Sequence, residues 1–189
     1  MTRHQKRRWF VSLIGVTSLL IGTIGATNAN AHTSKATYEF HAGDGGGIAS
    51  PDVAVAPNGE TVSVSVNGSF DAGGKTATGV GTFVHKAPNG TVLVSGTISV
   101  SDLTVFQFYG CGVAGGEPLP PELCGGRSLL RVSLHPEGHP DVSIAGTLEI
   151  ICLVGPNVPK GAEEGIKLNV PGLVHFNKSV SGETLFVAT

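Results

Sequence analysis

Residues 61–66 read TVSVSV, in which valine alternates strictly with threonine or serine. Successive side chains of a β-strand point to opposite faces of the sheet, so this stretch places Val62, Val64 and Val66 on one face. Alternation of this kind predicts a half-buried strand, and no window of the chain repeats apolar residues at helical spacing. The sequence therefore predicts an all-β fold.

The turn sequence APNG stands at residues 56–59, just before this strand, and again at residues 87–90. Proline presets the first central dihedral of a turn, asparagine tolerates the bridge region, and glycine accepts the left-handed conformation. Each copy lies between alternating segments. We therefore expect both to be hairpin tips of one antiparallel sheet.

Strand patterns cover most of the remaining chain, because valine, threonine, serine and glycine dominate it. The other expected strands are residues 37–41, 76–85, 91–100, 105–108, 128–135, 148–154, 165–170, 173–176 and 184–187. Short strands without a crossover helix favour an antiparallel β-barrel of about eight strands, which leaves no open edge. A β-sandwich is the alternative, and the choice matters because a barrel of this size holds a small ligand in its mouth.

The first 31 residues have the pattern of a cleaved export signal peptide. A basic beginning with Arg7 and Arg8 precedes an apolar stretch at residues 11–26 and the small-residue triplet Ala-Asn-Ala at residues 29–31. We expect cleavage before His32, a secreted or periplasmic protein, and no membrane insertion after signal removal. The arginine pair with Trp9-Phe10-Val11 resembles the twin-arginine export motif of bacteria, so that route and the general secretory route both stay open.

Residues 32–189 are expected to form a single all-β domain, and their charge argues against some partners. All fourteen acidic residues lie there, while Arg3, Lys6, Arg7 and Arg8 belong to the signal peptide. A surface that binds nucleic acid needs a clustered positive charge. We therefore expect neither nucleic acid nor an anionic membrane as a partner.

The three cysteines suggest one disulfide bond. Cys111 and Cys124 bound the loop CGVAGGEPLPPELC, which is rich in glycine and proline and has no core of its own. An exported chain allows a disulfide bond there. We expect a Cys111–Cys124 bond and a buried, unreactive thiol at Cys152 within LEIICLV. The rival pairing joins Cys152 to one of the other two.

His32 would become the first residue after cleavage, and it is the candidate metal ligand. An N-terminal histidine offers its α-amino and imidazole nitrogens to one metal ion, a ligand set that favours Cu(II). Five other histidines remain as possible partners, at positions 41, 85, 135, 139 and 175. His135 and His139 are expected in a turn and His85 beside a hairpin tip. His175 is expected in a strand, where a lone histidine is more often structural than a ligand.

Common catalytic arrangements lack a part in this sequence. No Gly-x-Ser-x-Gly nucleophile motif occurs in residues 32–189, and the acidic residues are scattered. We therefore expect a non-enzymatic protein without a cofactor, which binds a small apolar molecule or acts as an extracellular interaction module. The alternatives are a copper protein that uses His32, and a barrel-type isomerase or cyclase.

Overall fold

The computed structural model describes residues 37–44 and 51–189, and the elements in them are β-strands. The strands are β1 (Thr37–Ala42), β2 (Asp52–Val55), β3 (Thr61–Asp71), β4 (Thr76–Lys86), β5 (Val92–Cys111), β6 (Val113–Ala114), β7 (Glu117–Pro118), β8 (Leu123–Pro136), β9 (Ile144–Cys152), β10 (Gly165–Val170), β11 (Val174–Phe176), β12 (Lys178–Ser181) and β13 (Thr184–Ala188). The prediction of an all-β fold is confirmed. No helix in the described residues is long and apolar enough to span a membrane.

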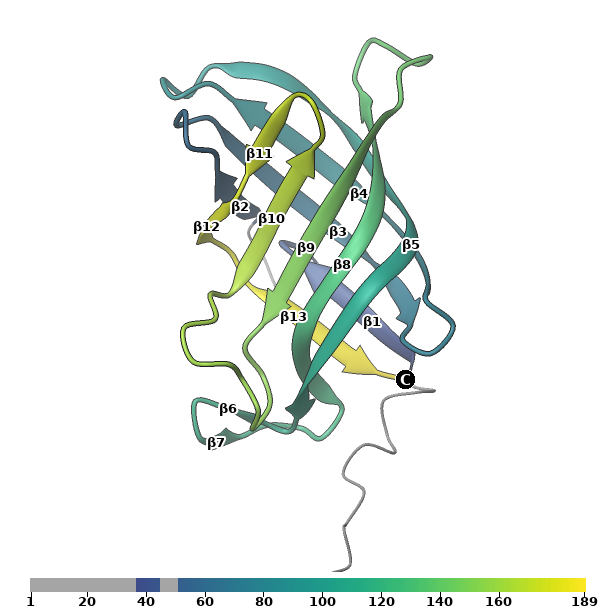
Figure 1. The fold of residues 1–189 in the computed structure, drawn as a ribbon, viewed down its shortest axis with the longest axis vertical. Coiled ribbons are helices and arrows are strands. Elements are labelled where there is room, and N and C mark those ends of the chain that lie inside the picture. Colours follow the sequence, from purple (N-terminus) through teal and green to yellow (C-terminus); the bar gives the residue numbers. More distant parts are fainter. Residues whose placement is uncertain (1–36, 45–50) are drawn as a thin grey trace, which may run out of the picture.

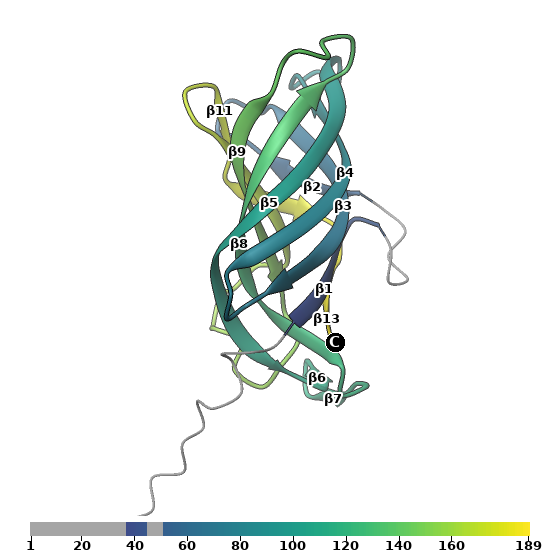
Figure 2. The ribbon, with the colours of Figure 1, turned by 90° about the vertical axis from the view of Figure 1, so that its right-hand side faces the viewer.

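Eleven of the strands form one antiparallel sheet, and β6 and β7 form a separate short hairpin (Figure 1). In the large sheet, β3 pairs with β1, β2 and β4, while β8 pairs with β5, β9 and β13. The molecule is elongated, and β5 and β8 wind along its length (Figure 2). The sheet is thus antiparallel as predicted, with more strands than the about eight that the sequence suggested.

Both APNG stretches form hairpin tips, as the sequence predicted. The first joins β2 to β3 and the second joins β4 to β5. The amides of Gly59 and Gly90 donate to the carbonyls of Ala56 and Ala87, each over 2.9 Å. Both glycines have a positive φ, 85° and 84°, a conformation that glycine adopts without strain. Both tips lie at one end of the molecule, the upper end in Figure 1.

Strand β5 corrects one expectation. Residues 91–100 and 105–108 were predicted as two strands, but they belong to a single strand that runs from Val92 to Cys111. The register against β8 shifts between Val100 and Asp102 and twice more toward the end of β5. Such bulges insert extra residues while the pairing continues, so the polar residues in the middle do not end the strand.

The core consists of the side chains that point inward from every second position of the strands. Val62, Val64 and Val66 are buried on one face of β3, as predicted. An aromatic cluster fills the interior toward the lower end; its rings belong to Tyr38, Phe40, Phe70, Phe106 and Phe186. The Phe70 ring lies 4.8 Å from Phe106 and 5.6 Å from Phe186 between ring centres, which is a favourable range for aromatic pairs.

The disulfide loop lies at the lower end of the molecule (Figure 1). Cys111 at the end of β5 is bonded to Cys124 at the start of β8, and the two residues are also direct partners in the sheet. The hairpin of β6 and β7 lies within this loop. Cys152 is buried and unbonded, and burial raises the pKa of its thiol to about 12. This is the arrangement that the sequence suggested.

Removal of the disulfide bond is expected to lower the free energy of unfolding by about 3 kcal/mol. Loop-closure entropy gives this value for a bridge across a loop of this size. The measurement is urea unfolding of the double variant Cys111→Ala/Cys124→Ala against the parent protein. The reduced parent protein is the control, and it should match the double variant. Equal stability of oxidised and reduced protein would contradict the prediction.

Candidate functional site

A small cavity of about 90 Å³ lies between the strands at the upper end of the molecule. The turns that join β4 to β5, β8 to β9 and β10 to β11 surround this end (Figure 1). The residues that line the cavity are Val62, Phe83, His85, Val94, Leu134, Pro136, Ile144, Leu168, Val170, Leu173, Val174 and Phe176. Every one of them except His85 is apolar.

Alternation along the strands turns these side chains inward. Phe83 and His85 are two residues apart in β4 and therefore lie on the same face. His85 pairs with Val62 of β3 on one side and with Val94 of β5 on the other. His85 is thus a polar side chain at an inward position, whereas the neighbouring inward positions hold apolar side chains.

The His85 side chain is held by two contacts. Its Nε2 atom lies 2.9 Å from Oε2 of Glu60, which stands between the first hairpin tip and β3. Its ring meets the ring of Phe176 edge to face, with the centres 5.1 Å apart. Both side chains of the pair are partly shielded, with exposed fractions of 17% for His85 and 25% for Glu60. The pair therefore presents an oriented imidazole to an apolar cavity.

Exposed apolar side chains gather around the same end. Val92 and Leu93 begin β5 directly after the second hairpin tip, Leu173 lies in the turn before β11, and Val142 lies in the loop before β9. Leu173 is 70% exposed, which is a large fraction for a leucine.

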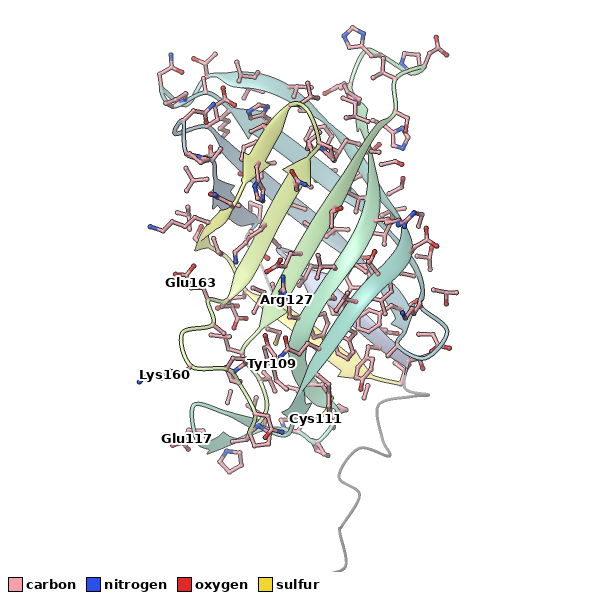
Figure 3. The ribbon with its side chains drawn as sticks, in the orientation of Figure 1. Tyr109, Cys111, Glu117, Arg127, Lys160 and Glu163 are labelled. Atoms are coloured by element: carbon pink, nitrogen blue, oxygen red, sulfur yellow. A yellow bond between two sulfur atoms is a disulfide. The ribbon has the colours of Figure 1, made fainter. Side chains whose placement is uncertain are left out.

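The lower end has a different character. Glu117 of the disulfide loop and Lys160 of the loop between β9 and β10 lie toward this end, whereas Glu163 of the second loop lies nearer the middle of the molecule (Figure 3). In the neighbouring strands β8 and β9, Arg127 donates a hydrogen bond to Glu149 over 2.9 Å. Burial opposes the ionisation of Glu149, but Arg127 holds the pKa of this carboxyl below its usual value. The ion pairs of Glu149 with Arg127 (2.9 Å) and with Lys167 (3.5 Å) join β9 to its neighbours β8 and β10.

Asp52 is the most unusual ionisable group of the interior. Its side chain is fully buried, and neither oxygen has a hydrogen-bond partner among the described residues. Burial raises its pKa to about 7, and the negative charges of Glu164 and Glu183 add to the rise. Glu164 itself accepts hydrogen bonds from the Leu153 amide and from Thr184. Asp52 is therefore protonated over most of the acidic range and about half ionised near pH 7.

The predicted metal ligand, His32, lies outside the described residues, and so does its proposed cleavage site. Among residues 37–44 and 51–189, no group of three or more histidine, cysteine, aspartate or glutamate side chains could hold a metal ion. The turn expected for His135 is wrong, because this residue belongs to β8, whose pairing with β5 continues to Pro136, and its ring contacts the Ser99 hydroxyl over 3.3 Å. His139 lies in the loop after β8, as expected.

The sequence indicates that His85 lies beside a hairpin tip, but it does not single out Glu60 as its partner. The alternation of β4 and the position of Glu60 beside a hairpin tip were visible in the sequence. The contact with Phe176 was not, because that residue comes from a distant strand. Comparisons with protein family models, with curated proteins and with solved structures found no match.

Proposed function

We propose that the protein binds a small apolar molecule in the cavity at its upper end. The observation that carries this proposal is a cavity lined by apolar side chains from seven strands and one turn, with a single polar side chain in its wall. Binding sites for small molecules have this composition, with few polar groups that fix the orientation of the ligand.

The size of the cavity limits the ligand. A dry protein cavity of about 150 Å³ accommodates benzene, so a cavity of about 90 Å³ encloses only part of an aromatic ring or a short branched chain. A larger molecule would leave part of its surface outside the cavity, against exposed side chains such as Leu173 and Leu93. The buried part of the ligand is thus smaller than a whole aromatic ring, and the rest of the molecule lies against these exposed side chains.

We also propose that the sheet closes into a barrel, with the cavity in its mouth. The support lies in the pairing of β1 with both β3 and β13, since β3, β4, β5, β8 and β13 pair in succession. Barrel mouths are frequent sites for small ligands. Export of the protein is part of the same proposal, and the signal-peptide pattern of residues 1–31 and the disulfide bond support it.

A cavity-filling variant tests the proposed function. Val94→Phe adds a ring at a lining position, whereas Val80→Phe makes the same change on β4 at a side chain that is 69% exposed. Calorimetric titration with toluene is expected to show saturable binding to the parent protein and to Val80→Phe. Binding to Val94→Phe should be at least about tenfold weaker, because the new ring occupies the space of the ligand.

Folding of the filled variant is checked by circular dichroism. A second filling variant, Val174→Phe in β11, guards against a local disturbance of β5. Failure of toluene to bind the parent protein, or equal binding by the parent and both filled variants, would refute the proposed function.

A further inference from the structure

We propose that the ligand of this cavity carries a hydroxyl group, and that Nδ1 of His85 accepts the hydrogen bond from it. The proposal rests on the proposed function, because it assigns a ligand class to the same cavity. The expected ligand is a phenol or another small cyclic alcohol, whose ring enters the apolar part of the cavity.

His85 occupies a position that suits an apolar side chain. An inward residue between Val62 and Val94, opposite Phe176, would pack well as an apolar residue. Burying a polar group without a partner is unfavourable, so an imidazole at this position needs hydrogen bonds to offset its lost hydration. Glu60 supplies one such bond and leaves the second ring nitrogen to be matched.

Glu60 determines which ring nitrogen of His85 carries the hydrogen. A carboxylate accepts hydrogen bonds and donates none, so the Nε2 atom of His85 carries the hydrogen in their 2.9 Å contact. The other ring nitrogen, Nδ1, then has a free lone pair in the neutral ring and is an acceptor. A hydroxyl group can donate to it, whereas a ketone, an ether or a halogen cannot.

The Nδ1 atom of His85 is accessible to a partner outside the protein. The Nδ1 atom of His41 is fully buried and has no partner among the described residues, but the Nδ1 atom of His85 is not among the buried unpartnered atoms. The described residues supply His85 with a hydrogen bond at Nε2 only. Its Nδ1 is therefore open to a water molecule or a ligand atom, and the lining of the cavity by His85 favours a ligand atom there.

Three matched probes test the proposal. p-Cresol and toluene differ by one hydroxyl group, and 4-fluorotoluene has a similar size to p-cresol without a donor. Calorimetric titrations at pH 8 give a dissociation constant for each probe. Each variant is described by one ratio, the affinity for p-cresol divided by the affinity for toluene. The hydration free energy of each probe is the same for every variant, so it cancels when the ratio is compared between variants.

The decisive variant is His85→Phe, which keeps a ring in the wall and removes the acceptor. Its ratio is expected to be about tenfold lower than that of the parent protein, which corresponds to one lost hydrogen bond. His175→Phe makes the same change at an exposed residue of β11, and its ratio should equal that of the parent. The affinity for 4-fluorotoluene should follow that for toluene in all three proteins.

Glu60 has a positioning role and is tested separately. Glu60→Leu should lower the ratio in part while the affinity for toluene stays unchanged. Nitrogen-15 NMR should show the His85 ring protonated at Nε2 in the parent protein and a mixture of the two tautomers in Glu60→Leu.

The outcomes separate this inference from the proposed function. Toluene binding by the parent protein with an unchanged ratio in His85→Phe would overturn the inference and leave the proposed function standing. The same holds if 4-fluorotoluene binds as tightly as p-cresol. Absence of saturable binding by all probes would overturn both.

Discussion

Replacement of Asp52 by asparagine is expected to stabilise the protein by about 4 kcal/mol at pH 8. The carboxyl group is fully buried, and burial raises its pKa from 3.8 to about 7. Each pKa unit corresponds to about 1.36 kcal/mol, so ionised Asp52 destabilises the folded state by about 4 kcal/mol. Asparagine carries no charge at any of these pH values and avoids this penalty.

The sign of the pH dependence follows from the raised pKa. Below about pH 4 the group is protonated in both the folded and the unfolded chain, so the two proteins should differ little. Between about pH 4 and pH 7 the unfolded chain loses the proton first, and the stability of the parent protein falls relative to Asp52→Asn. Above pH 7 the difference is complete and constant.

Chemical unfolding at pH 3.5, 5.5 and 8 measures this difference. The control is Asp102→Asn, which removes a carboxyl from an exposed position in β5. Its stability relative to the parent should change by less than about 1 kcal/mol over the same range. A constant difference between Asp52→Asn and the parent at all three pH values would show that Asp52 ionises normally.

Replacement of Phe40 by alanine should lower the free energy of unfolding by about 4 kcal/mol. The side chain is fully buried, and its ring approaches the glycine pair Gly68 and Gly79 of β3 and β4, where no side chain could fill the space that it leaves. Truncation of a buried phenylalanine loses apolar contact and leaves a cavity, with typical losses of about 3–5 kcal/mol.

The matched measurement is urea unfolding of Phe40→Ala and Val80→Ala. Val80 follows Gly79 in β4 but points to solvent, and its truncation should change stability by less than about 0.5 kcal/mol. A loss below about 2 kcal/mol for Phe40→Ala would mean that the surrounding side chains collapse into the space of the ring.

The strands that the sequence predicted best are those whose alternation matches the burial. In β3, every second residue from Val62 to Val66 is apolar and buried, so local pattern and tertiary packing agree. Strands β2 and β12 were not expected, because each has only four residues. They form through pairing with one another and, for β2, with β3, and such long-range contacts leave no periodic pattern in a short segment.

The candidate site was less predictable than the fold. Periodicity places His85 on the inward face of β4, but the partners that orient it come from elsewhere: Glu60 lies 25 residues earlier and Phe176 is in β11. The buried state of Asp52 was equally hidden, since an aspartate after a proline is typical of an exposed turn. Both features arise from strand pairing across the sheet.

Methyl NMR of the protein titrated with toluene tests the central claim most directly, because it reports both binding and position. The methyl groups of Val62, Val94 and Leu168 line the cavity, whereas Val105 and Val180 are exposed elsewhere on the sheet. The proposed function predicts saturable shifts of the first three signals and unchanged signals of the other two. Shifts that spread evenly over all five methyl-bearing residues, or no saturable shift at Val62, Val94 and Leu168, would contradict a ligand site in this cavity.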